Sequence, residues 1–229
     1  MNSWLKPVKT AIALNNGFVL LTIISTKGST PCSNGDKIVY SGDKSIFGSI
    51  GGGNLEFKAL SFAEELLSLN SNGIYLKKYP LGATLGQCCG GYVKVMFESF
   101  VQSDSTNSWI ETVSNLLHDK EDFVVATIVD NNSEIEYNSK KFVYLNEDSR
   151  PSLDDEELSS LINKNAKDLL LFSDNPTIVQ FKNKLGSVVE ICFEKVLASE
   201  VQPVVVFGAG HISRALMPIL INLPIKIYW

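Results

Sequence analysis

Histidine is scarce in this chain of 229 residues, which holds only two. One of them, His118, lies beside Asp119 and Lys120 at what we predict to be a solvent-facing helix end. The chain therefore offers no pair of histidine general bases and no nucleophile–histidine–carboxylate triad. This scarcity argues against an enzyme that relies on such acid–base chemistry.

Long apolar runs and an excess of basic residues are missing too. No run approaches the roughly 20 residues needed to span a bilayer, and the apolar residues 11–14 are interrupted too early for a signal peptide. Lysine and arginine number 20 against 25 acidic residues, which gives a net charge of −5. We therefore expect neither a membrane nor a nucleic acid as partner.

Cysteine is limited to Cys32, Cys88, Cys89 and Cys192, and two of these are adjacent. That layout suits no disulfide framework, and we expect reduced thiols in a cytoplasmic protein. No second cysteine pair or histidine cluster completes a zinc site. The acidic run 154–157 is read as a solvated helix start and not as a metal site.

What the chain does contain is an alternation of strand and helix patterns, which predicts an α/β fold. We expect a mixed-sheet N-terminal domain over residues 1–199, followed over 200–229 by the first, incomplete βαβ part of a Rossmann-like domain. Helices are predicted around 54–69, 107–118, 152–168 and 212–220, the second of these starting with its apolar pattern at Trp109 and the third at Ser152. Strands are predicted at 18–25, 37–40, 73–79, 92–100, 123–129, 135–137, 141–144, 188–193, 204–207 and 223–229.

The first glycine motif reads Gly-Ser-Ile-Gly-Gly-Gly-Asn-Leu-Glu and begins at residue 48. A predicted strand enters a predicted helix through Gly51, Gly52 and Gly53, so backbone N–H groups are free to converge on an anion or phosphate. Asn54 is expected to cap the helix, and Glu56 stands in its first turn. The alternative is a tight turn that lets the helix pack closely on the sheet.

The second glycine motif, at 86–91, reads Gly-Gln-Cys-Cys-Gly-Gly. A thiol beside glycines is accessible, and an accessible thiolate is what nucleophilic or metal-ligand chemistry needs. Cys88 and Cys89 are therefore both candidate thiols, and Gly90 and Gly91 are candidate site residues beside them. The alternative is a buried thiol that packs as a small apolar group.

The third glycine motif, Gly-Ala-Gly-His, places Gly208, Gly210 and His211 between a predicted strand and a predicted helix. It keeps two glycines of the dinucleotide fingerprint but has Ser213 at the third position. The acidic residue expected about 20 residues later would lie beyond the last residue. We therefore expect no full NAD(P) binding by this chain. His211 is either a contact for a ligand phosphate or a surface residue of the helix start.

In this order and spacing, the motifs resemble the XdhC/CoxI family of xanthine dehydrogenase accessory proteins. The family pattern runs Gly-Ser-Xaa-Pro-Arg, then Gly-Thr-Ile-Gly-Gly-Gly-Xaa-Leu-Glu, then Cys-Gly-Gly and Gly-Ala-Gly-His. Its counterparts here are residues 28–31, 48–56, 89–91 and 208–211. The resemblance implies a molybdenum-cofactor chaperone. Such proteins bind the molybdopterin form of the cofactor, protect it, aid its sulfuration and deliver it to a xanthine dehydrogenase-type molybdoenzyme.

The resemblance also implies roles for particular residues. The amides of Gly51 to Gly53 would cradle the phosphate or the pterin, and Cys89 would stand near the molybdenum as a metal ligand or a station for sulfur. Glu56 would hydrogen-bond pterin N–H groups, or alternatively only cap the helix. A cysteine desulfurase is the candidate partner for sulfuration, and a homodimer is the expected assembly.

Two departures from the family pattern leave other readings open. Cys32 stands where the family has arginine, which removes a charge-assisted contact worth about 1.5–3 kcal/mol unless Lys37 substitutes for it. The Rossmann-like part is expected to be truncated. The alternatives are a truncated, inactive remnant of such a protein and an NAD-dependent oxidoreductase.

Overall fold

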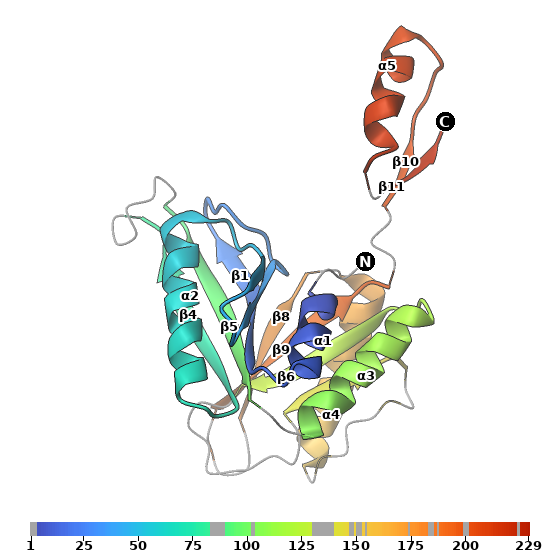
Figure 1. Ribbon diagram of the computed structural model, residues 1–229. Helices are drawn as coiled ribbons and strands as arrows, with labels where there is room; N and C mark the ends of the chain where they lie inside the picture. Colours follow the sequence, from blue (N-terminus) through green and yellow to red (C-terminus); the bar gives the residue numbers. More distant parts are fainter. Residues whose placement is uncertain are drawn as a thin grey trace.

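The computed structural model describes residues 4–82, 90–101, 104–129, 140–146, 149, 153, 155–173, 175–182, 186, 188–198, 202–223 and 225–229. These residues form five helices and three sheets, whose arrangement is drawn in Figure 1. None of the helices described combines the length and apolar character that crossing a bilayer requires. The predicted α/β fold class is confirmed.

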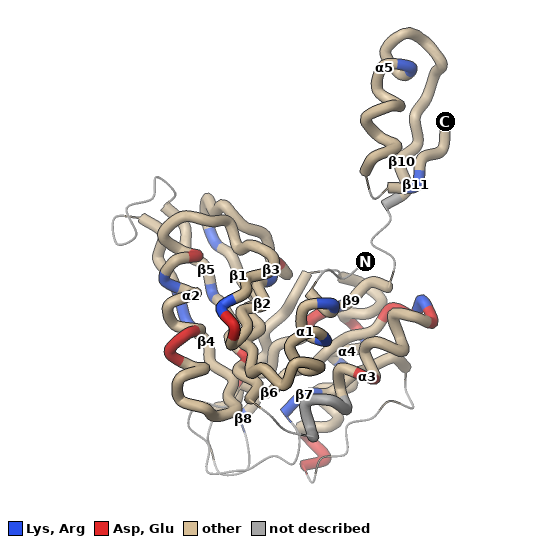
Figure 2. Tube along the Cα trace, viewed as in Figure 1, with Lys and Arg blue, Asp and Glu red and all other residues tan. Residues whose placement is uncertain are grey.

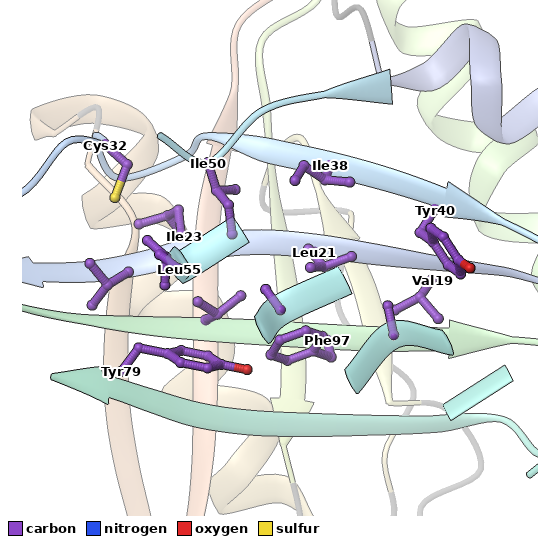
Figure 3. Close-up of a cluster of buried hydrophobic side chains, with 14 of the residues drawn as sticks. Val19, Leu21, Ile23, Cys32, Ile38, Tyr40, Ile50, Leu55, Tyr79 and Phe97 are labelled. Atoms are coloured by element: carbon purple, nitrogen blue, oxygen red, sulfur yellow. The ribbon is translucent and has the colours of Figure 1, made fainter. Parts of the chain in front are cut away.

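The first sheet has the strand order β3-β2-β1-β5-β4, and all its neighbouring strands are antiparallel. Because alternate residues of a strand face opposite sides, one face of the sheet is free to pack against helix α2 (Gly53–Ser68). Val19, Leu21 and Phe97 of the sheet form a buried cluster with Leu55 of this helix (Figure 3). The strands are β1 (Phe18–Lys27), β2 (Lys37–Ser41), β3 (Ile46–Gly48), β4 (Gly73–Pro80) and β5 (Tyr92–Phe100).

The second sheet has the order β7-β6-β9-β8 and is also antiparallel throughout. Helix α4 (Glu156–Phe172) covers one face, where Leu158 and Ile162 pack against Val124 and Phe193. Burying each of these side chains stabilises the fold by about 1.5–3 kcal/mol. The strands are β6 (Phe123–Val129), β7 (Lys141–Tyr144), β8 (Thr177–Lys182) and β9 (Val188–Val196).

The remaining faces of the two sheets pack against each other. Ile24 and Met96 of the first sheet meet Val129 and Cys192 of the second in a small apolar cluster. Helices α1 (Leu5–Ala13) and α3 (Asp104–His118) contact each other and close one side, packing against residues of both sheets. The layers therefore run α2, first sheet, second sheet, α4.

A small unit follows at the C-terminal side and stands apart from the packed sheets in Figure 1. Strands β10 (Gln202–Val205) and β11 (Ile225–Tyr228) pair in parallel and are joined by helix α5 (His211–Leu220). Arg214 and Lys226 are its only Lys, Arg, Asp or Glu side chains, which Figure 2 shows as isolated blue segments. The predicted parallel β–α–β arrangement is therefore present.

Three details differ from the predictions. The strands before residue 199 form two antiparallel sheets and not one mixed sheet, because the described neighbours all pair in opposite directions. The N-cap of α2 is Gly52 and not Asn54, since φ 70° and ψ −166° suit only glycine there. Helix α4 begins after Asp155 and not at Ser152, because the Asp155 carboxylate accepts from the N–H groups of Glu157 and Leu158. The predicted strand 135–137 lies outside the described residues.

Candidate functional site

The loop that enters α2 requires glycine at three consecutive positions. Gly51, Gly52 and Gly53 have φ angles of 102°, 70° and 62°, in the left-handed region that side-chain-bearing residues rarely adopt. The chain thereby turns sharply from β3 into the helix. The predicted strand–glycine–helix passage is therefore present.

Glu56 reaches back over this loop from the first turn of α2. Its Oε2 accepts hydrogen bonds from the backbone N–H of Ile50 at 3.0 Å, that of Gly52 at 3.1 Å and the Ser49 hydroxyl at 2.8 Å. Ser49 Oγ in turn accepts from the N–H of Gly51 at 3.2 Å. An internal carboxylate thus takes the place that an anion would occupy at this helix N-terminus. The geometry favours the capping alternative for Glu56.

A second segment, residues 28–31, contacts this loop and also contacts a third, residues 90–91. A Cβ placed on Gly28 would lie 3.0 Å from Cα of Gly91, and one placed on Gly51 would lie 3.0 Å from the carbonyl oxygen of Pro31. A Cβ on Gly91 would collide with the carbonyl oxygen of Lys27. Such close backbone packing brings the three segments together at one end of the first sheet. We call this place the glycine junction and define it as residues 28–31, 49–53 and 90–91.

Part of the junction remains open. A Cβ placed on Gly52 or on Gly90 would meet no described atom within 4 Å. Cys88 and Cys89, which precede Gly90 in the chain, lie outside the described residues. Within the described ranges, no three His, Cys, Asp or Glu side chains gather where they could hold a metal ion.

The position after Pro31 provides no cation. Cys32 is buried in the cluster between the first sheet and α2 (Figure 3). Burial raises the pKa of its thiol, and the neighbouring Asp36 carboxylate raises that pKa further. Lys37 does not replace the missing arginine, because its ammonium donates to Glu194 Oε2 and to Thr22 Oγ1, each at 2.8 Å.

The third motif lies elsewhere. Gly208, Gly210 and His211 belong to the C-terminal unit, where Gly210 caps α5 and the exposed His211 begins the helix. Trp229 Nε1 donates to the carbonyl oxygen of Gly208 at 2.8 Å. The structure therefore links the first two motifs through residues 28–31 and keeps the third separate.

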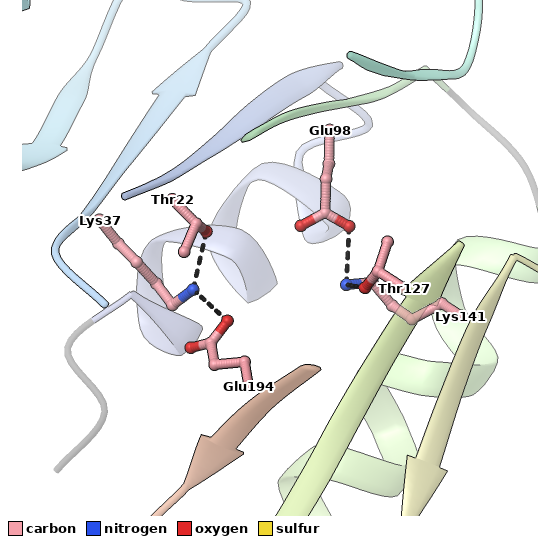
Figure 4. Close-up of polar contacts among 6 residues, drawn as sticks. All are labelled: Thr22, Lys37, Glu98, Thr127, Lys141 and Glu194. Carbon is pink, nitrogen blue, oxygen red and sulfur yellow. Dashed lines mark hydrogen bonds and ion pairs between the residues drawn. The ribbon is translucent and has the colours of Figure 1, made fainter. Parts of the chain in front are cut away.

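The ion pairs between the two sheets were not predicted from the sequence. Lys37 pairs with Glu194, Lys94 with Glu190 and Lys141 with Glu98, at 2.8, 3.0 and 2.7 Å. Each pair joins a strand of the first sheet to one of the second, and Figure 4 shows two of them. The sequence feature that could have indicated these pairs is a lysine or glutamate at alternate positions of otherwise apolar strands.

Comparisons with known proteins agree with this fold. Residues 11–79 match the sequence model of the XdhC and CoxI family. A solved structure from Bacillus halodurans, described as a xanthine dehydrogenase, matches with a TM-score of 0.58 at 16% identity, over 96% of this chain and 60% of that chain. The chain thus spans 60% of that structure's length, and at this identity the likeness shows the fold alone. A search among curated proteins finds no match.

The matched segment contains two of the three parts of the glycine junction, residues 28–31 and 49–53. The resemblance inferred from the motifs is thereby confirmed. Over its residues 11–79, the chain therefore resembles the XdhC and CoxI family.

Proposed function

We propose that this chain is an accessory protein of a xanthine dehydrogenase-type enzyme that holds the molybdenum cofactor at the glycine junction. It protects the cofactor there, aids its sulfuration and delivers it to the recipient enzyme. The observation that carries this proposal is the meeting of segments 28–31, 49–53 and 90–91 at one end of the first sheet. The family match over residues 11–79 supports the accessory role.

The open side of the junction fits a ligand that approaches the backbone closely. Gly52 and Gly90 present bare backbone, since no described atom lies within 4 Å of a Cβ built on either residue. Cys89 directly precedes Gly90 in the sequence. When bound, the cofactor supplies a metal centre that accepts a thiolate ligand and carries the terminal sulfur. Cys89 is the residue we assign to that contact.

The amides at the start of α2 do not fit an external phosphate. Glu56 already accepts from the N–H groups of Ile50 and Gly52, and a phosphate beside its carboxylate would be repelled. We therefore place the anionic part of the ligand away from these amides. The separate Gly208, Gly210 and His211 are likewise no part of the proposed site.

Anaerobic titration of the intact chain with molybdenum cofactor released from a molybdoenzyme tests the proposal. We expect saturable binding that weakens about tenfold or more in Cys89→Ser, as loss of one metal–ligand or charge-assisted contact implies. Cys88→Ser is the matched control and should bind like the parent chain. Absence of binding by the folded parent chain would contradict the proposal and favour the inactive alternative.

A further inference from the structure

A cleft separates the edge of the first sheet from the end of β9. Its volume is about 580 Å³, within the range of small-molecule pockets. Asp36 and Lys37 at the start of β2 line it together with Phe47 and Ser49, and Glu194 lines it from β9. Ser49 also donates to Glu56, so the cleft adjoins the glycine junction.

The Glu194 carboxylate lines this cleft, and one of its two oxygens is already paired with a lysine. Glu194 Oε2 pairs with Lys37 Nζ at 2.8 Å, and its second oxygen points away from that contact in Figure 4. The Glu194 side chain is 17% exposed and the Lys37 side chain 9%. Lys37 also donates to Thr22, which fixes the ammonium and hence the orientation of the carboxylate. A ligand donor entering the cleft would therefore meet an oriented acceptor.

Aromatic side chains line the same cleft. Trp4 is half-buried and stacks on Trp109 with ring centroids 6.3 Å apart, which restrains its indole. Phe47 on the edge strand β3 is 48% exposed. Aromatic faces favour flat ring systems, which stack on them. The Lys37 ammonium lies 5.6 Å from the Trp4 ring centroid, so Phe47 provides the exposed ring face. Together with the oriented carboxylate, this face favours a flat, hydrogen-bond-donating ring.

We propose that this cleft binds a flat nitrogen heterocycle that presents two adjacent N–H donors, an amide N–H beside an amino group. The free oxygen of Glu194 accepts one of these hydrogen bonds and the remaining lone pair of Oε2 accepts the other, while Phe47 contacts the ring and Trp4 borders it. Pterins and guanine share this donor edge, whereas adenine does not. The inference deepens the proposed function and rests on it for the pterin, because the cleft would hold the heterocycle of a cofactor whose metal end lies at the glycine junction.

Titration of the intact chain with free pterin, guanosine monophosphate and adenosine monophosphate tests the proposal, with tryptophan fluorescence and ligand anisotropy as readouts. We expect the first two ligands to bind and the third not to bind. Glu194→Gln should weaken binding about tenfold or more, because the amide replaces one carboxylate oxygen with an NH2 group and removes the charge that strengthens the hydrogen bonds. Glu190→Gln is the matched control: it breaks the Lys94 pair on the same strand but does not line the cleft. Thermal unfolding of both variants confirms that they fold.

The outcomes separate this inference from the proposed function. Binding of pterin alone would identify the pterin ring as the ligand, and binding of guanosine monophosphate as well would identify the shared edge. Equal binding of adenosine monophosphate, or equal loss in Glu194→Gln and Glu190→Gln, would overturn the inference. Molybdenum cofactor that binds with the same affinity to Glu194→Gln would also overturn it while leaving the proposed function intact. Pterin bound in the cleft of a chain that binds no cofactor would reject only the proposed function.

Discussion

At the scale of single residues, Gly91 has the least room in the glycine junction. A Cβ there would lie 2.6 Å from the carbonyl oxygen of Ser29 and even closer to that of Lys27, and backbone atoms cannot move aside. We expect Gly91→Ala to lower the free energy of unfolding by about 1–3 kcal/mol, toward the upper end. Urea unfolding measures this change. Gly90→Ala, where an added Cβ is unobstructed, should stay within about 0.5 kcal/mol of the parent, and equal losses would contradict the close packing.

Cys192 gives a second residue-scale prediction, on alkaline stability. Burial, with smaller contributions from the Glu194 and Glu98 carboxylates, raises the pKa of its thiol from 9.0 to about 12, although Lys37 and Lys141 act in the opposite direction. Between these values the unfolded chain loses a proton that the folded chain keeps. The stabilisation is therefore complete below pH 9 and is lost at about 1.4 kcal/mol per pH unit as the pH rises toward 12.

The difference in unfolding free energy between the parent and Cys192→Ala isolates this effect. It should be constant below pH 9 and shrink between pH 9 and 11, as urea unfolding at each pH would show. Other groups that titrate in this range contribute equally to both proteins and cancel. A difference that stays constant up to pH 11 would show that the thiol titrates alike in both states.

At the scale of elements, buried ion pairs connect β5 to β7 and β9. The Glu98 side chain is 1% exposed and the Lys141 side chain 11%. Lys141→Met leaves a buried carboxylate without its ion-pair partner and should lower the free energy of unfolding by about 3–5 kcal/mol. Adding Glu98→Leu removes the stranded charge and should restore much of the loss. The exposed Lys44–Glu64 pair provides the control, because Lys44→Met should cost less than about 1 kcal/mol. Equal costs at both sites in urea unfolding would contradict a buried role for Lys141.

Among the individual elements, the sequence correctly predicted the strands and helices that depend on a local pattern of residues. The buried runs of β1, β5 and β6 and the helix after Gly53 followed from periodicity and glycine. Helix α1 was not predicted, because its nine residues include a proline and this region was considered only as a possible signal peptide. Strand β8 was missed because its mixed polar and apolar residues suit an edge strand, whose burial depends on its partner β9.

At the scale of the whole molecule, the C-terminal unit differs from the packed sheets. Phe207, Ile212 and Trp229 are 91%, 73% and 58% exposed, and two strands alone make a marginal sheet. We expect backbone amides of β10 and β11 to exchange with solvent much faster than those of β1 and β5, in hydrogen exchange measured by mass spectrometry. Protection that increases with protein concentration would support the predicted homodimer. Protection equal to that of β1 at low concentration would contradict the marginal character of this unit.

The site could be predicted from sequence only in part. The glycine motifs indicated backbone that comes close to other backbone, but which motifs meet depends on strand order. The packing of Gly28 on Gly91 follows from the β1–β5 pairing, which links residues far apart in the chain. The sequence left two roles open for Glu56, a ligand contact or a helix cap, because a sequence does not show which amides a side chain satisfies. The inter-sheet cleft was missed for a similar reason, since it depends on how two sheets pack.

Molybdenum-cofactor titration of Gly90→Leu tests most directly whether the site lies at the glycine junction. No described atom lies within 4 Å of a Cβ placed on Gly90, so we expect little change in unfolding free energy, while the leucine blocks the ligand's approach to the backbone. Gly210→Leu is the matched control, because a Cβ there is equally unobstructed and Gly210 lies in the separate C-terminal unit. We predict affinity about tenfold lower or more for Gly90→Leu and parent affinity for Gly210→Leu. Parent affinity in a folded Gly90→Leu protein would contradict a cofactor site at the glycine junction.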